Sequence, residues 1–151
     1  MIGNDYYEIA CNDLLYLQAT LDTGLYNQIA VQAEQVTEKM LKSVAERYCV
    51  GIEKLMNTHN LRGIYDQIHK ALPSFVLDRH RLSTLKDLYF DAKYPGDNFV
   101  EVDEELCTEC LSIMYETIEA VTKARESLGL PCKANEVKML CDHELRKSTV
   151  F

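Results

Sequence analysis

Residues 25–50, LYNQIAVQAEQVTEKMLKSVAERYCV, decide the fold of this protein. Apolar side chains recur every three or four residues from Ile29 to Tyr48, and a second apolar stripe runs beside the first from Ala30 to Ala45. This spacing is that of an α-helix rather than of a strand. A helix with so wide an apolar face is packed on two sides. We therefore expect it at the centre of a helical bundle, or shared between the bundle and a partner chain.

The segments next to this helix have the same periodicity. Residues 4–22 form a predicted helix that Gly24 ends. A further helix is predicted to start near His59, with Thr58 as its N-cap, and to stop before Pro73, because proline cannot donate a hydrogen bond into a helix. Helices therefore flank the central one on both sides in sequence.

The second half of the chain continues the pattern. Ser74 or Asp78 can cap a helix that reaches about residue 92, and residues 93–102, KYPGDNFVEV, form a predicted loop. Asp103 is the predicted N-cap of the last long helix, which ends at Gly129. No stretch alternates strictly enough to predict a strand.

The expected fold is therefore all-α, an antiparallel helical bundle of about five helices in one domain over residues 1–130. A C-terminal extension follows over residues 131–151 and can form a short helix from about 134 to 147. A chain of 151 residues is of the usual size for a single domain.

Charge limits the kinds of partner. The formal net charge is −8 and the pI is about 5.0, which argues against a protein that coats nucleic acid, because phosphate binding depends on clustered Lys and Arg. Any RNA contact is therefore expected to be local. The start of the chain has acidic residues where a signal peptide needs positive ones, and no run approaches ~18 apolar residues. We expect a cytoplasmic protein whose six cysteines are free thiols.

Three motifs are informative together. They are AEQVTEKMLKSV at 33–44, Thr58-His59-Asn60-Leu61, and DAKYPGDN at 91–98. In this order and spacing the chain resembles the HEPN domain, a small antiparallel helical domain, over about residues 4–128. The sequence departs from the family pattern at Asn60, where the family usually has Asp, and at Lys93, where it usually has Arg. Lysine cannot make the bidentate contacts of a guanidinium.

The resemblance implies one of two activities. Many HEPN proteins are metal-independent ribonucleases, often toxins, that use an Arg-x(4–6)-His motif near the start of the last core helix across a homodimer. Others lack the motif and bind nucleotides or act beside a minimal nucleotidyltransferase. Residues 93–128, where the motif is expected, contain no histidine.

Arg62 and His69 have the spacing of the catalytic pair, but they lie on the predicted helix that starts near His59. Residues seven apart on a helix point the same way. An imidazole could then take the proton of a ribose 2′-hydroxyl while the guanidinium holds the phosphate. The alternative is that both are exposed polar residues of an amphipathic helix.

Other residues are candidates for binding a nucleotide or RNA. His59 can complete a helix cap or meet a ligand phosphate. The cations near the motifs could contact phosphates or simply form a solvated face, and tyrosines could stack on bases or lie at an interface. The candidates are Lys39, Lys42, His59, Lys93 and Tyr94.

A metal site is not predicted. Cys107 and Cys110 form a C-x-x-C that Cys132, Cys141 and His143 could complete, but Cys110 falls in the apolar stripe of its helix and a second C-x-x-C is missing. No cofactor motif occurs.

The resemblance therefore implies a HEPN module that binds a nucleotide or RNA without cleaving it, or partners a minimal nucleotidyltransferase in a toxin–antitoxin or defence system, or does both. The alternatives are a metal-independent endoribonuclease and a purely structural or interaction protein. In each case we expect a homodimer that buries part of the apolar face of the central or last long helix.

Overall fold

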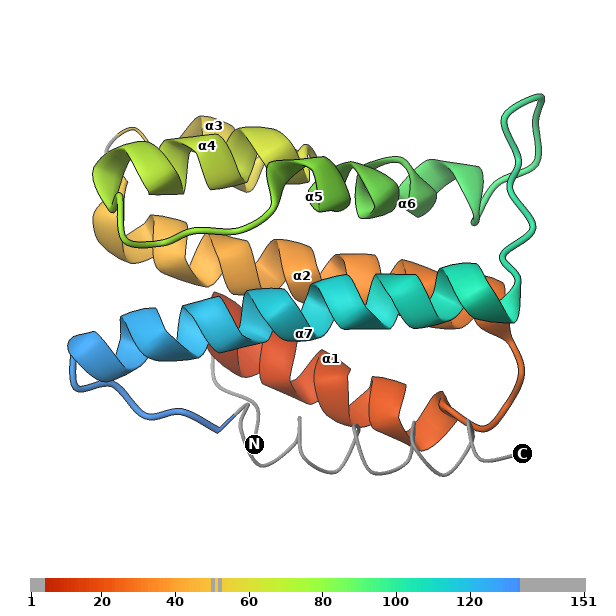
Figure 1. The fold of residues 1–151 in the computed structure, drawn as a ribbon, viewed down its shortest axis with the longest axis horizontal. Helices are drawn as coiled ribbons and strands as arrows, with labels where there is room; N and C mark the ends of the chain where they lie inside the picture. Colours follow the sequence, from red (N-terminus) through yellow and green to blue (C-terminus); the bar gives the residue numbers. More distant parts are fainter. Residues whose placement is uncertain (1–4, 50, 52, 134–151) are drawn as a thin grey trace.

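The computed structural model describes residues 5–49, 51 and 53–133, which form an all-α bundle without strands in these ranges (Figure 1). Two long helices, α2 and α7, lie side by side at its centre, and α1 packs on one side of α2. These three helices are α1 (Tyr6–Thr20), α2 (Tyr26–Tyr48) and α7 (Glu104–Ser127).

A layer of shorter helices covers the opposite side of α2 (Figure 1). In sequence this layer follows α2 and precedes α7, and its last part, α5 and α6, leads back to the end of the bundle where α2 begins (Figure 1). Helix α7 therefore has the same direction as α2, whereas α1 and α2 are antiparallel. The helices of this layer are α3 (Glu53–Met56), α4 (Leu61–Ala71), α5 (Arg79–Lys86) and α6 (Leu88–Asp91).

The position predicted for residues 25–50 is confirmed. The apolar side chains of α2 face α1 and α7 on one side and α4 and α6 on the other, so both stripes are buried within the chain itself. Burial of a Leu or Met side chain contributes about 1.5–3 kcal/mol relative to exposure. The wide apolar face is thus explained by the central place of α2 in the bundle.

Several predicted helix ends are also confirmed. The Asp103 carboxylate accepts a hydrogen bond from the N–H of Leu106 at 2.8 Å, and Asp78 accepts from the N–H groups of His80 and Arg81. These three bonds satisfy backbone donors that the first helical turn leaves free. Gly129 has a φ of 69°, the left-handed conformation that favours glycine after a helix.

Two predictions at the level of single elements were wrong, and one short helix was missed. The cap of α4 is Asn60, whose side chain accepts from the N–H of Gly63 at 3.2 Å, and Thr58 instead bonds the N–H of Asn60. The helix predicted up to residue 92 is divided at Asp87 into α5 and α6. The short helix α3 was not predicted, because four residues are too few to show a periodicity.

The predicted loop after α6 is held to the bundle by one side chain. The amide of Asn27 donates to the carbonyls of Ala92 and Val100, at 2.9 and 2.8 Å, and accepts from the N–H of Val102 at 2.8 Å. Three bonds from the first turn of α2 therefore fix both ends of the loop. This positions Lys93 and Tyr94, which lie within it, beside the layer of short helices.

No helix in the described part of the chain combines the length and the apolar character needed to cross a membrane. The predicted helix from about 134 to 147 lies outside the described residues.

Candidate ligand-binding site

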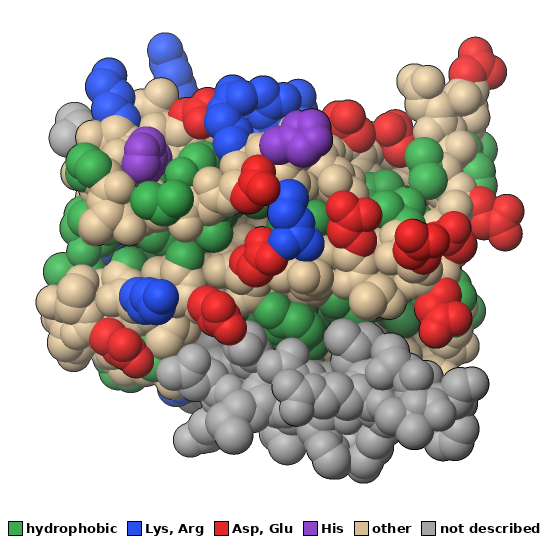
Figure 2. Space-filling view, viewed as in Figure 1, with side chains coloured by type: hydrophobic (Ala, Val, Ile, Leu, Met, Phe, Trp, Pro, Cys, Tyr) green, Lys and Arg blue, Asp and Glu red, His purple; other side chains and the backbone are tan. Residues whose placement is uncertain are grey.

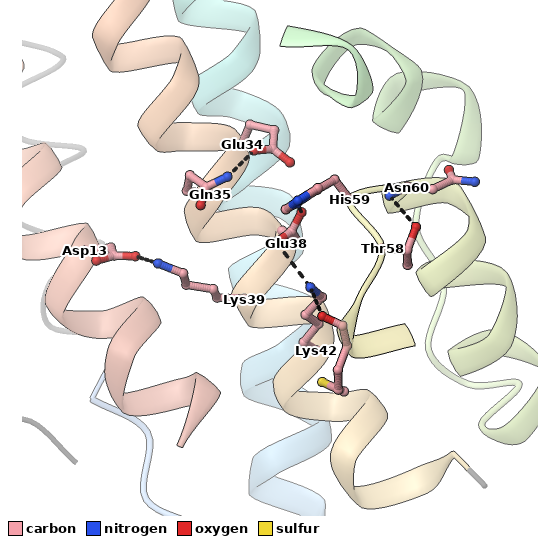
Figure 3. Close-up of polar contacts among 10 residues, drawn as sticks. Asp13, Glu34, Gln35, Glu38, Lys39, Lys42, Thr58, His59 and Asn60 are labelled. Atoms are coloured by element: carbon pink, nitrogen blue, oxygen red, sulfur yellow. Dashed lines mark hydrogen bonds and ion pairs between the residues drawn. The ribbon is translucent and has the colours of Figure 1, made fainter. Parts of the chain in front are cut away.

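A row of three charged side chains on α2 is buried where the short helices cover it. Glu34, Glu38 and Lys42 are spaced four apart, which places them on one side of the helix, and their exposed fractions are 0%, 4% and 3%. Figure 3 shows them pointing from α2 toward the segment that leads into α4. Charged residues are almost never buried unless they are paired. We therefore expect partners in the fold for these three residues, which we call the polar row.

Glu38 is the centre of these contacts. One of its carboxylate oxygens lies 2.7 Å from Nδ1 of His59, and the other lies 3.3 Å from Nζ of Lys42 (Figure 3). Lys42 also donates to the carbonyl of Met56 at 3.0 Å. The polar row thus joins α2 to the segment between α3 and α4, with one negative and one positive charge opposed in a buried place.

Glu34 lies one turn before Glu38 and is fully buried. Burial, and then the negative charge of Glu38, raise the pKa of Glu34 to about 8. Gln35 donates to one of its oxygens at 2.7 Å, and the other oxygen has no hydrogen-bond partner among the described residues. Burial and the neighbouring carboxylate thus both favour the neutral form of Glu34.

An aromatic surface lies on the outer side of His59. The imidazole stacks on the ring of Tyr89, with 4.7 Å between centroids and 11° between planes, and Phe90 meets both rings edge-on. The Lys93 ammonium lies 4.9 Å from the centroid of Tyr89 and 5.5 Å from that of Tyr94. Half of the Phe90 and Tyr94 side chains is exposed. We call these five residues the aromatic cluster: His59, Tyr89, Phe90, Lys93 and Tyr94.

The structure brings most of the predicted binding residues together. His59, Lys93 and Tyr94 belong to the aromatic cluster, and Lys42 lies behind it through Glu38. Lys42 is buried, so the expectation of a solvated face is wrong for it. His59 bonds a side chain of α2 and not the backbone of a helix start. Lys39 is separate, because it points to the opposite side of α2 and pairs with Asp13 of α1 (Figure 3).

Sequence reasoning missed four members of the site: Glu34, Glu38, Tyr89 and Phe90. The two glutamates and Lys42 stand at spacings of four in the stretch 33–44, and this regular row was a usable signal. The two aromatic residues gave none, because they lie in the predicted apolar part of a helix. In the structure Phe90 lies on α6 and is 54% exposed.

Arg62 and His69 both lie on α4, as predicted. The exposed His69 uses Nδ1 to donate to the carbonyl of Phe75 at 2.9 Å and stacks on Tyr65. Nε of Arg62 is buried and has no hydrogen-bond partner among the described residues. Among the described residues, neither side chain has a hydrogen bond, ion pair or ring contact with the aromatic cluster, and a catalytic role for the pair stays a prediction.

A separate groove runs between α7 and the segment before α5. It has a volume of about 790 Å³, is walled by Phe75, Val76 and Ala120, and has Glu116 and Lys123 at its edge. None of the predicted site residues lines it. Figure 2 shows the surface there as mixed in charge, with basic and histidine side chains over α4 and α5 and acidic ones toward the start of α7.

The described cysteines are free thiols, and three of them, Cys11, Cys107 and Cys110, are buried. Burial raises the pKa of the Cys107 thiol to about 11 and that of Cys110 to about 12. Within the described residues no group of three or more His, Cys, Asp or Glu side chains is placed to hold a metal ion. Cys141 and His143 lie outside those residues.

The geometry defines a class of protein: an all-α bundle in which three motifs, far apart in sequence, meet at one site. A family model described as the HEPN domain matches residues 4–125, and this chain belongs to the HEPN family. Neither curated proteins nor solved structures gave a match.

Proposed function

We propose that this protein is a HEPN module that binds a nucleotide or a short stretch of RNA at the aromatic cluster, without cleaving it. The observation that carries the proposal is the convergence of the three motifs, since Glu38 and Lys42, then His59, then Lys93 and Tyr94 come from one motif each. Residues from separate segments that contact one another in this way contribute jointly to binding or to stability.

The chemistry of the exposed side favours binding. Phe90 and Tyr94 present half-exposed rings, and Lys93, an exposed residue, has its ammonium 5.5 Å from the centroid of the Tyr94 ring. A base stacked on an aromatic side chain contributes about 1–3 kcal/mol. Lysine acts on phosphate as a point charge. One base and one phosphate are therefore the ligand groups for which this surface is suited.

The overall charge agrees with a small ligand. A net charge of −8 opposes a long polyanion, whereas one nucleotide or a few bases need only a local cation. The second candidate class, an endoribonuclease, would need the Arg62–His69 pair, whose His69 is engaged with the Phe75 carbonyl.

The test is calorimetric titration with ATP, GTP and an RNA tetranucleotide. Lys93→Ala and Tyr94→Ala are each expected to weaken binding about tenfold, or ~1.4 kcal/mol. Lys123→Ala and Tyr16→Ala are matched controls, because both residues are exposed and lie on α7 and α1. Binding that survives both cluster substitutions but is lost in Lys123→Ala would move the ligand to the groove and refute the proposal.

We further propose that the module works as a homodimer in the cytoplasm beside a minimal nucleotidyltransferase, in a toxin–antitoxin or defence system. Membership of the HEPN family supports this. The apolar face of α2 is buried within the chain, so an interface must use other residues. Light scattering of the purified protein measures the oligomeric state, and a monomeric mass at micromolar concentration would contradict the homodimer.

A further inference from the structure

His59 has two chemically different sides. Its Nδ1 faces the Glu38 carboxylate at 2.7 Å, in a place where Glu38 is 5% exposed by side chain. The ring itself is 46% exposed and lies in the aromatic cluster. Because Nδ1 is engaged inward, Nε2 is the ring nitrogen left for a ligand. A carboxylate behind an imidazole fixes the orientation of the ring and stabilises its charged form.

The charges behind the ring are balanced before His59 is counted. Glu38 opposes Lys42 at 3.3 Å, and burial together with the Glu38 charge raises the pKa of Glu34, which favours the neutral form of that carboxyl. A proton on His59 therefore adds positive charge to this group, and Lys93 contacts the same Tyr89 ring. Positive charge at an exposed imidazole favours the binding of an anion.

The other groups around the ring do not oppose this. Tyr89 of α6 contributes an aromatic face. Asp87 and Asp91, at the ends of α6, have no hydrogen bond or ion pair to the ring among the described residues. Within the described part of the chain, Glu38 is thus the only carboxylate with a hydrogen bond or ion pair to His59, and it lies on the side away from solvent.

We propose that His59 binds the phosphate of the ligand as an imidazolium, and that ligand binding therefore takes up a proton. Glu38 is the positioning residue, since it holds Nδ1–H and leaves Nε2–H to donate to a phosphate oxygen. This inference rests on the function proposed above and gives it a direction: the site holds the phosphate end of the nucleotide at His59, and its affinity depends on pH.

The test is titration of the whole protein with ATP between about pH 7 and about pH 8.5, where phosphate is already largely deprotonated and a free imidazole is largely neutral. The affinity is expected to fall as the pH rises over this range. Titrations in two buffers with different ionisation enthalpies are expected to show uptake of one proton. With ATP bound, ¹⁵N spectra are expected to show both ring nitrogens of His59 protonated.

Variants separate this mechanism from a general effect of pH. His59→Gln is expected to bind weakly and without pH dependence, whereas His80→Gln, a change at an exposed histidine on α5, should keep the wild-type slope. Lys93→Ala should bind more weakly at every pH and also keep the slope. The double variant Glu38→Gln/Lys42→Met removes both buried charges together and is expected to reduce the proton uptake.

The outcomes are distinct. If ATP binds with an affinity that does not change with pH, or if His59→Gln keeps the slope, this inference is wrong and the proposed function stands. If neither ATP, GTP nor RNA binds at any pH, both are wrong.

Discussion

The polar row of α2 and the outer side of α4 look alike in sequence and differ in the structure. Glu34, Glu38 and Lys42 are spaced four apart, and Arg62, Asp66 and His69 are spaced four and three apart. The first set is almost fully buried. The second is exposed or half-exposed, and Asp66 pairs with Arg79 at 2.9 Å in solvent. Spacing places side chains on one side of a helix, but the elements that pack against that side decide whether those side chains are buried and which groups they contact.

The difference has an energetic consequence. Opposed charges in a buried place are costly to separate, because removal of one leaves the other without water or partner. Exposed pairs contribute roughly 0–1 kcal/mol, because water screens them. We therefore expect changes in the polar row to be severe and changes on the outer side of α4 to be mild.

The largest effect is expected for Lys42→Met. It leaves Glu38 without its buried cation and should reduce the free energy of unfolding by about 3 kcal/mol, measured by urea denaturation. Lys39→Met is the matched control on the same helix, because the Lys39–Asp13 pair is partly exposed, and its cost should be below about 1 kcal/mol. Equal losses of unfolding free energy in the two variants would show that burial does not set the cost of losing a charge pair on α2.

Glu34→Gln tests the protonated carboxyl. Burial raises the pKa of Glu34 from 4.5 to about 8, so between these values the folded protein holds a proton that the unfolded chain has lost. Stability contributed by this group therefore falls as pH rises from about 5 to about 8. The variant lacks this loss, and we expect its stability relative to wild type to improve by about 2 kcal/mol over that range.

Urea denaturation at several pH values measures this difference. Glu126→Gln is the control, because that glutamate is exposed near the end of α7. A constant difference between Glu34→Gln and wild type across the range would show that Glu34 is ionised when folded.

Smaller effects are expected for Arg62→Ala and His69→Ala. Loss of the His69 bond to the Phe75 carbonyl should cost about 1 kcal/mol. If the pair is not catalytic, wild type and both variants leave single-stranded and hairpin RNA intact in EDTA. If the wild type cleaves RNA and either substitution abolishes the cleavage, α4 carries the active site. The outer side of α4, and not the polar row of α2, would then be the functional region.

The smallest effect is expected for Arg79→Ala. Its pair with Asp66 is fully in solvent, with half of the arginine side chain exposed. We expect no measurable change in the thermal midpoint, checked by calorimetry at low and high salt. If Arg79→Ala clearly lowers the thermal midpoint at low salt but not at high salt, the outer side of α4 contributes more to stability than its exposure indicates.

The fold was largely predictable because the helices are long and periodic. The places of α1, α2 and α7, the caps Asp78 and Asp103, and the loop after residue 92 follow from local spacing and capping chemistry. The break at Asp87 and the short helix α3 were not predictable, because a few residues give no periodicity and depend on packing against α2.

The candidate site was predictable only in part. His59, Lys93 and Tyr94 were found from the resemblance, and the structure places them in one aromatic cluster. Glu34 and Glu38 were missed because a carboxylate on a helix is usually exposed. Phe90 was missed because its contacts with His59, Tyr89 and Tyr94 include partners far away in sequence.

The sequence by itself determined that this chain is an all-α protein with α2 at its centre, and that it carries the HEPN motifs, because helical periodicity and capping act over a few neighbouring residues. Only the tertiary structure decided that Glu38 joins His59 and Lys42, that Glu34 is held neutral, and that Lys93 lies on Tyr89. These contacts join segments far apart in the chain, and burial, which sets their strength, exists only once the layers have packed.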